Sequence, residues 1–160
     1  MISLTLRERR IRRILIGRAQ AAADPSEALI FYKDLYWAVP PELPTNSYPG
    51  NGQAWSRELA TRLYHISTYE HEHGRPLLTV FVVHQSDGRV GDGFIKMARG
   101  LGHKVDDEQA FWAAGLAAVV DFWSDADPTR TGDALLERVM GELQVVRSRL
   151  RALEATIAKV

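Results

Sequence analysis

The strongest β-strand pattern in the chain is LLTVFVV at residues 77–83. Six of these seven residues are apolar, and Val and Phe are common in strands. A nearly continuous apolar run without alternation indicates a strand that is buried on both faces. Ser86-Asp87-Gly88 follows, and an Asp-Gly pair favours a tight reverse turn. We therefore expect one buried strand or a small hairpin at the centre of the domain.

Helical patterns lie on both sides of this strand. The predicted elements cover residues 4–23, 26–39, 54–73, 93–99 and 106–123. Gly74 and Pro76 end the helix that precedes the strand. Residues 40–52 hold four prolines and two glycines and are expected to form a loop. A three-helix unit followed by a strand and a tight turn is the element order of a winged helix. We therefore expect an α-rich α+β domain over residues 1–124.

The composition excludes several classes of protein. The 160 residues hold 20 basic and 20 acidic side chains, so a contact with nucleic acid needs a local basic patch. The absence of cysteine excludes disulfides, a thiol nucleophile and a thiolate metal site. No window approaches the roughly 18 apolar residues of a membrane span, and the Arg-rich N-terminus lacks the apolar core of a secretory signal. We expect a cytoplasmic protein that does not enter the membrane.

The end of the chain carries a heptad repeat. Its apolar positions alternate in steps of three and four: Leu136, Val139, Leu143, Val146, Leu150, Leu153, Ile157 and Val160. This 3.5-residue period predicts a coiled-coil oligomerisation helix over residues 133–160, joined by a linker at 125–132. The pattern predicts a homodimer, although Leu at a with Val at d also allows a tetramer. The alternative is a helix that packs on its own domain.

Arginine is concentrated near the N-terminus. Guanidinium groups bind phosphates, so the candidate nucleic-acid contacts are Arg9, Arg10, Arg12 and Arg13, with Arg57, Arg62 and Arg89 added by the winged-helix interpretation. In that interpretation the helix 54–73 enters the groove and Arg89 lies in the wing. The alternative is a solvated charged face that pairs with acidic residues.

Glu70 and His84 are the candidate acid/base pair, with His71 and His73 nearby. The two histidines of a His-x-His pattern on a helix point about 200° apart, so both cannot hold one ion unless the helix has already ended before Gly74. We expect neither a metal nor a cofactor. The alternative for these histidines is a favourable interaction with the helix C-terminus.

Two family resemblances accompany these patterns. Gly74-Arg75-Pro76-Leu77-Leu78, the strand and Gly91-Asp92-Gly93-Phe94 resemble the core of an uncharacterised family of bacterial and phage-borne proteins, over about residues 29–123. That family has no established activity, so the resemblance implies none. The order of helices and Gly-containing turn is also similar to the DNA-binding domain of alkylguanine-DNA alkyltransferase-like proteins. Without cysteine the chain cannot accept an alkyl group, so this likeness implies at most a DNA-binding fold.

The leading interpretation is a non-enzymatic, self-associating protein that binds nucleic acid or a protein target, such as a winged-helix-like regulator. One alternative is a small metal- or acid/base-dependent hydrolase or nuclease. The other is a pure protein-interaction module or inhibitor.

Overall fold

The computed structural model describes residues 2–39 and 54–124, together with residues 143, 146, 147, 149 and 150. The chain divides into two compact units, Met1–Asp125 and Ala126–Val160. We call the first unit the head domain. It is α-rich with one small sheet, which confirms the α+β class.

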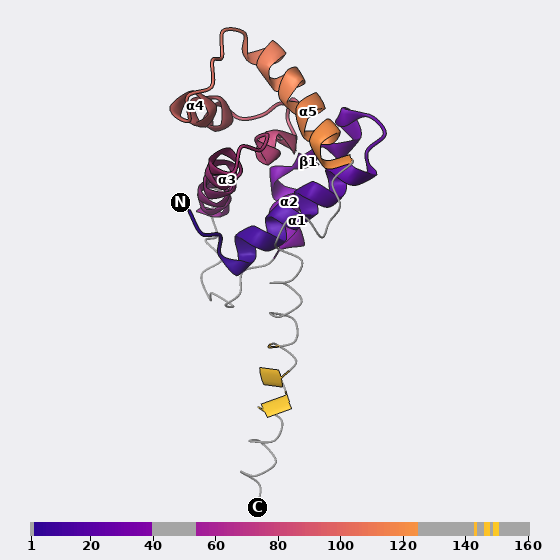
Figure 1. Ribbon diagram of the computed structural model, residues 1–160, viewed down its shortest axis with the longest axis vertical. Coiled ribbons are helices and arrows are strands. Elements are labelled where there is room, and N and C mark those ends of the chain that lie inside the picture. Colours follow the sequence, from indigo (N-terminus) through magenta and orange to yellow (C-terminus); the bar gives the residue numbers. More distant parts are fainter. Residues whose placement is uncertain (1, 40–53, 125–142, 144–145, 148, 151–160) are drawn as a thin grey trace, which may run out of the picture. The chain divides into compact units, whose positions relative to one another are not determined.

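The head domain contains five helices, two 3-10 turns and two very short strands among its described residues (Figure 1). In chain order these are α1 (Leu6–Ala21), η1 (Pro25–Ala28), β1 (Ile30–Phe31), α2 (Tyr32–Ala38), α3 (Ala54–Glu72), η2 (Leu78–Phe81), β2 (Val82–Val83), α4 (Asp92–Gly100) and α5 (Glu108–Ser124). Each helix predicted within residues 1–124 is present, with ends within a few residues of the expected ones, except that 26–39 divides into η1, β1 and α2.

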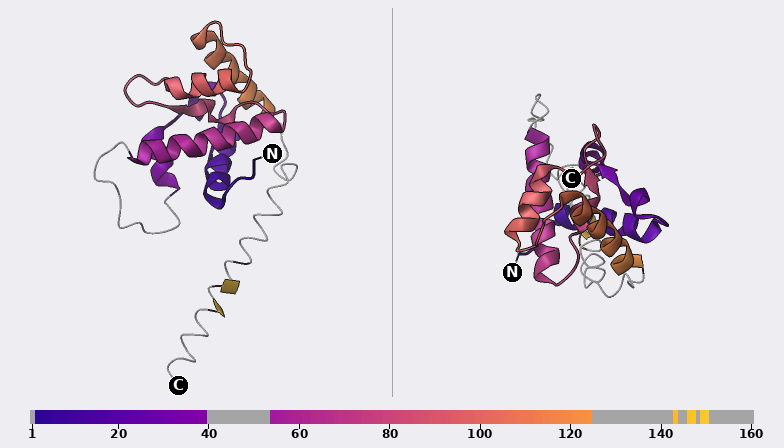
Figure 2. Two further views of the ribbon diagram at one scale, coloured as in Figure 1. Left: turned by 90° about the vertical axis from the view of Figure 1, so that its left-hand side faces the viewer. Right: turned by 90° about the horizontal axis from the view of Figure 1, so that it is seen from above.

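The segment 77–83 forms the centre of the core, as its sequence predicts. Leu78, Val80 and Phe81 are fully buried, and the rest of the segment is at most 7% exposed. Around it lie α1, α3 and α5, which contact η2 from different directions (Figures 1 and 2). Burial on all sides is therefore confirmed.

The predicted strand at 77–83 is wrong for most of its length. Residues 78–81 form the 3-10 turn η2, and only Val82–Val83 are extended as β2. The amide of Val80 donates to the Leu77 carbonyl at 3.1 Å, and the Trp112 indole donates to the Val80 carbonyl at 3.1 Å. Buried backbone groups need partners, and here local turns and a side chain supply them instead of neighbouring strands.

The small sheet joins distant parts of the head domain. β1 pairs with β2 in parallel, with Ile30 opposite Val82 and Phe31 opposite Val83. The alternative prediction of a small hairpin is wrong. The turn after β2 leads into α4, and within residues 54–124 no second strand follows it. The turn itself is present. The amide of His84 donates a hydrogen bond to the Arg89 carbonyl at 2.8 Å, and Gly88 has a φ of +66°.

The helix ends follow their sequence signals. Thr5 and Glu8 form a capping box at the start of α1, satisfying amide groups that the first turn leaves without partners. Gly74 has a φ of +66° after the end of α3, where a side chain would be strained. None of the described helices is both long enough and apolar enough to cross a membrane.

Candidate functional site

The arginines of α1 divide between its inner and outer faces. Arg7 and Arg12 are 6% and 2% exposed and point into the head domain, whereas Arg9 and Arg10 are half-buried and Arg13 is exposed. The prediction that Arg12 contacts nucleic acid is therefore wrong, because a phosphate cannot reach this buried side chain. Arg18 is also occupied, since its guanidinium donates to backbone carbonyls around Ala28.

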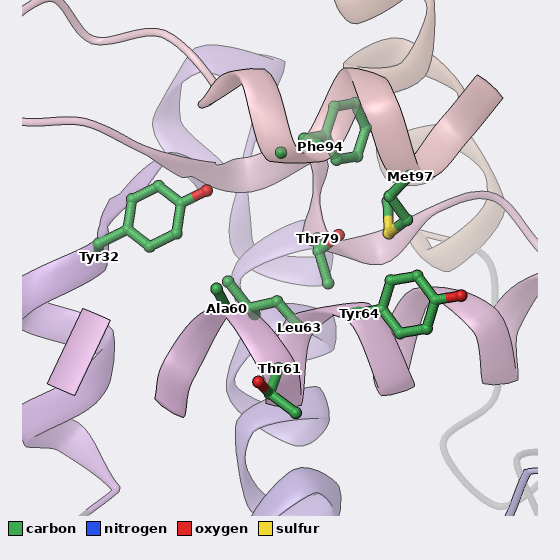
Figure 3. Close-up of a pocket in the computed structure, with 9 residues that line it drawn as sticks. Tyr32, Ala60, Thr61, Leu63, Tyr64, Thr79, Phe94 and Met97 are labelled. Atoms are coloured by element: carbon green, nitrogen blue, oxygen red, sulfur yellow. The ribbon is translucent and has the colours of Figure 1, made fainter. Parts of the chain in front are cut away.

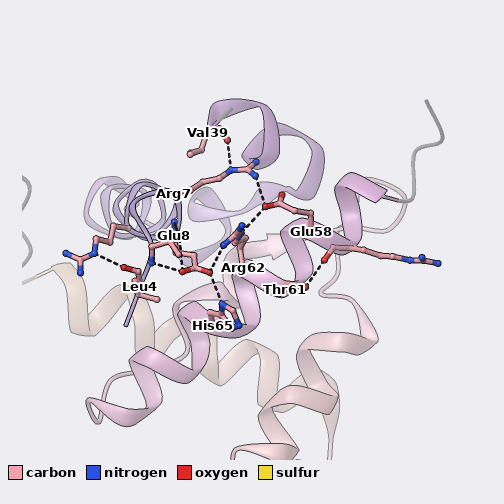
Figure 4. Close-up of polar contacts among 11 residues, drawn as sticks. Leu4, Arg7, Glu8, Val39, Glu58, Thr61, Arg62 and His65 are labelled. Carbon is pink, nitrogen blue, oxygen red and sulfur yellow. Dashed lines mark hydrogen bonds and ion pairs between the residues drawn. The ribbon is translucent and has the colours of Figure 1, made fainter. Parts of the chain in front are cut away.

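Glu8 is the centre of a charged network between α1 and α3 (Figure 4). It is fully buried, and its Oε1 lies 2.8 Å from Nδ1 of His65 and 3.3 Å from the Arg62 guanidinium. Its Oε2 accepts from the amide and the hydroxyl of Thr5 at 2.8 and 2.9 Å. Arg62, a predicted groove contact, is therefore an internal partner of this carboxylate.

Arg7 extends the same network. Its guanidinium donates to Oε1 of Glu58 at 2.7 Å and to the Val39 carbonyl at 3.1 Å, as Figure 4 shows. Its charged end also lies 4.9 Å from the centre of the Tyr36 ring. Arg62 donates to the same Glu58 oxygen at 2.9 Å, so Glu58 joins both arginines.

Glu70 is a buried partner of two arginines rather than a base. It is fully buried, accepts a hydrogen bond from Nε of Arg12 and forms an ion pair of 3.2 Å with Arg75. The Arg12 guanidinium also lies 5.3 Å from the centre of the Trp123 ring. Full burial and the two adjacent arginines leave this carboxylate no open side for a substrate.

His84 has different neighbours from Glu70. It is exposed at the end of β2, and its ring stacks on Tyr32 with centroids 4.9 Å apart. The predicted acid/base pair is therefore not formed, because Glu70 and His84 have separate partners. His71 lies near His103, with ring centroids 5.2 Å apart, and Nδ1 of His73 lies 2.7 Å from the Tyr69 carbonyl. Within the described part of the chain, no three potential metal ligands come together.

The remaining predicted nucleic-acid residues lie at the surface. Arg57 on α3 is exposed, and so is Arg89 in the turn after β2. The amide of Arg89 donates to Asp87 at 3.0 Å, which fixes the turn rather than the side chain. The outward basic residues of α1 thus lie on one helix face, whereas Arg57 and Arg89 come from other elements.

A pocket of about 370 Å³ lies between α3 and α4 (Figure 3). Its lining residues are all uncharged: Tyr32, Ala60, Thr61, Leu63, Tyr64, Thr79, Gly93, Phe94 and Met97. Sequence reasoning missed this site because its residues come from four separate elements. The one available signal was Thr79, a hydroxyl within an otherwise apolar run.

Five residues of the terminal segment are described, and all are helical and exposed. Leu143, Val146 and Leu150 are 52%, 51% and 52% exposed, and Arg147 and Arg149 accompany them. The other predicted seam positions lie outside the described residues: Leu136, Val139, Leu153, Ile157 and Val160. The same is true of the expected linker at 125–132 and the loop at 40–52.

Comparisons of the chain with protein-family models, with curated proteins and with solved structures found no match.

Proposed function

We propose that this chain is a self-associating binding protein, in which the terminal helix joins copies of the chain and the head domain contacts nucleic acid. The observation that carries the first part is the exposure of Leu143, Val146 and Leu150. They follow the 3-4 spacing of a coiled-coil seam, and each is about half exposed within a single chain. Burying such a seam against a second copy is favourable, since apolar surface leaves water.

The charges beside the seam support a parallel homodimer. In that arrangement a g residue meets the e residue of the next heptad on the partner helix. The sequence pairs Glu142 with Arg147 and Arg149 with Glu154, which are both pairs of opposite sign. A tetramer remains the second arrangement that the Leu and Val positions allow.

Light scattering with substituted chains tests the assembly. Leu143→Asp with Leu150→Asp places two carboxylates in each seam, and an unpaired buried charge costs roughly 3–5 kcal/mol. We expect this variant to be monomeric while the head domain stays folded by circular dichroism. Gln144→Asp with Ala152→Asp is the matched control, because it adds the same charge at b and c positions outside the seam. A wild-type monomer at high micromolar concentration, or equal effects of both pairs, would contradict self-association.

The basic outer face of α1 supports the second part of the proposal. The only acidic residue of this helix, Glu8, is buried against α3, where it contacts His65 and Arg62, whereas Arg9, Arg10 and Arg13 lie on the outward face. Phosphates are attracted to clustered guanidinium groups with little dependence on base sequence. The contact surface we propose is this face, which a dimer would present twice.

The winged-helix version of this proposal assigns the groove contact to α3. Arg57 and Thr61 are exposed on that helix, which suits the assignment, but Arg62 and His65 hold Glu8. Arg89 would follow as a contact beside the groove. We therefore propose α1 as the main contact, with Arg57 and Arg89 as additional ones.

Salt dependence of binding to duplex DNA tests this contact. Replacing Arg9, Arg10 and Arg13 by Gln should weaken binding and flatten the slope of log affinity against log salt by about 0.9 for each phosphate that is no longer bound. The matched control replaces Lys33, Lys96 and Lys104, which are exposed elsewhere on the head domain, by Gln. If both triple variants behave alike, the α1 face is not the contact. If the wild type does not bind at low salt, the chain is an assembly module with a protein partner.

A further inference from the structure

The pocket between α3 and α4 combines aromatic walls with an uncharged lining. The rings of Tyr32, Tyr64 and Phe94 come from α2, α3 and α4, and the Met97 thioether lies beside those of Tyr64 and Phe94 (Figure 3). A charged ligand would lose its hydration here without gaining an opposite charge. Flat apolar molecules gain from contacts with rings and with a polarisable sulfur. The lining therefore favours an uncharged aromatic molecule.

Tyr32 supplies a hydrogen-bond donor within this apolar lining. Its phenolic oxygen accepts a hydrogen bond from the Gly91 amide, so its own O–H can still donate. Burial raises the pKa of Tyr32, which keeps the phenol neutral and protonated near neutral pH. The hydroxyl of Thr79 is already 2.5 Å from that of Ser67, and the Thr61 hydroxyl donates to the Arg57 carbonyl. Tyr32 is thus a half-buried donor in the pocket that a ligand can use.

Gly93 lines this pocket at the start of α4. A Cβ added at Gly93 would meet no heavy atom within 4 Å. At the neighbouring Gly91 a Cβ would lie 2.6 Å from Nε2 of His84, so there a side chain would have to displace the His84 ring. The two glycines at the start of α4 therefore differ: position 93, which lines the pocket, has room for a side chain, whereas position 91 does not.

We propose that this pocket binds a small, uncharged aromatic molecule that accepts a hydrogen bond from Tyr32. The volume of about 370 Å³ lies near the lower end of the range for small-molecule sites, which suits a ligand of one or two fused rings. The site does not depend on self-association or on nucleic acid.

Coumarin is a suitable probe, because it is uncharged, has two fused rings and carries a carbonyl acceptor. We expect its titration to shift the amide resonances of Gly93, Thr79 and Met97 in ¹H–¹⁵N spectra of the full chain. Coumarin-3-carboxylate should bind at least tenfold more weakly, since its charge finds no partner. Absence of shifts with coumarin, or equal affinity for the two probes, would overturn the proposal.

Substitutions locate the probe. Gly93→Leu should fill the pocket and weaken coumarin at least tenfold, whereas Gly17→Leu should leave affinity unchanged, because Gly17 also has no neighbour within 4 Å but lies on α1. Tyr32→Phe should weaken coumarin by about fivefold, the worth of one hydrogen bond, and leave naphthalene unaffected. Unchanged coumarin affinity in Gly93→Leu would remove the site. Equal weakening of both probes by Tyr32→Phe would remove the hydrogen bond from the proposal.

Discussion

Nδ1 of His65 lies 2.8 Å from Oε1 of Glu8, which joins the middle of α3 to the first turn of α1. Burial opposes ionisation of Glu8, but hydrogen bonds from Thr5, His65 and Arg62 together outweigh it, so the pKa of Glu8 is lowered. The carboxylate therefore stays charged inside the head domain. Two of its partners, Arg62 and His65, come from a helix more than fifty residues away, so these contacts belong to the tertiary fold.

Because the pKa of Glu8 is lowered, the free energy of unfolding should depend on pH in the acid range. A carboxyl whose pKa is lower in the folded chain than in the unfolded chain stabilises the fold at pH values above its unfolded pKa, near 4.5. This stabilisation is lost as the pH falls through the folded pKa. Glu8→Gln should lower the free energy of unfolding by roughly 1–3 kcal/mol at pH 7. Urea denaturation at pH 7 and pH 3 should show a smaller difference from wild type at pH 3. Glu108→Gln, on the surface, is the control, and a deficit independent of pH would contradict this account.

The buried pair of Arg12 and Glu70 should tolerate joint replacement better than single replacement. Arg12→Met leaves a buried carboxylate with Arg75 as its remaining charged partner, and losing one member of a buried pair costs roughly 3–5 kcal/mol. Arg12→Met with Glu70→Leu should recover a large part of this in urea denaturation.

The surface pair of Arg99 and Glu108 is the control for that experiment. Its side chains are 48% and 57% exposed, so Arg99→Met should cost less than about 1 kcal/mol. If the double variant at Arg12 and Glu70 is no more stable than the single one, the two charges do not act as a pair.

His103 should make the fold less stable in mild acid. Burial and the nearby charge of His71 lower the pKa of His103 below 6.5. As pH falls through 6.5, the unfolded chain takes up a proton that the folded chain does not, so stability declines. In His103→Gln the loss of stability between pH 7.5 and 5.5 should be smaller, as measured by thermal unfolding. A folded-state NMR titration of His103 at or above 6.5 would contradict the prediction.

Two glycines should respond oppositely to leucine. A Cβ at Gly115 on α5 would lie 3.2 Å from a methyl group of the fully buried Val80, so Gly115→Leu should cost about 1–3 kcal/mol or more through overpacking. Gly17→Leu on the exposed side of α1 should stabilise by up to about 0.8 kcal/mol, because glycine is a poor helix former. Equal effects in urea denaturation would mean that α5 does not pack closely on η2.

Sequence alone predicted the burial of residues 77–83 but not their conformation. Apolar residues report that a segment leaves water, whereas the choice between strand and turn depends on which groups satisfy its backbone. Here Trp112 donates to Val80 from thirty-two residues away, and no local pattern encodes that bond. The helices were easier to predict, since signals such as Gly74 act within a few residues.

The candidate site was harder to predict for the same reason. The abundance of arginine in residues 4–23 does not tell which guanidinium meets an acidic partner, and Glu58 and Glu70 lie far along the chain from Arg7 and Arg12. The pocket depends on Tyr32 and Met97, which only the tertiary fold brings together. Leu143 and Leu150, in contrast, could be identified from the sequence, because heptad spacing is a local property.

The order of charges on α1 also disfavours packing of this helix against α3 in a shifted register. Arg7, Glu8 and Arg12 meet Glu58, then Arg62 and His65, then Glu70, so the signs alternate along both helices. A slip of four residues, about 6 Å, would bring Arg12 to the place of Glu8, against the Arg62 guanidinium and the His65 ring. Ile16 would then face Glu70 and leave its buried carboxylate without Arg12. The same slip would bring Ala19 to the place of the fully buried Leu15, so the ionic pairs and the apolar packing both favour the native docking.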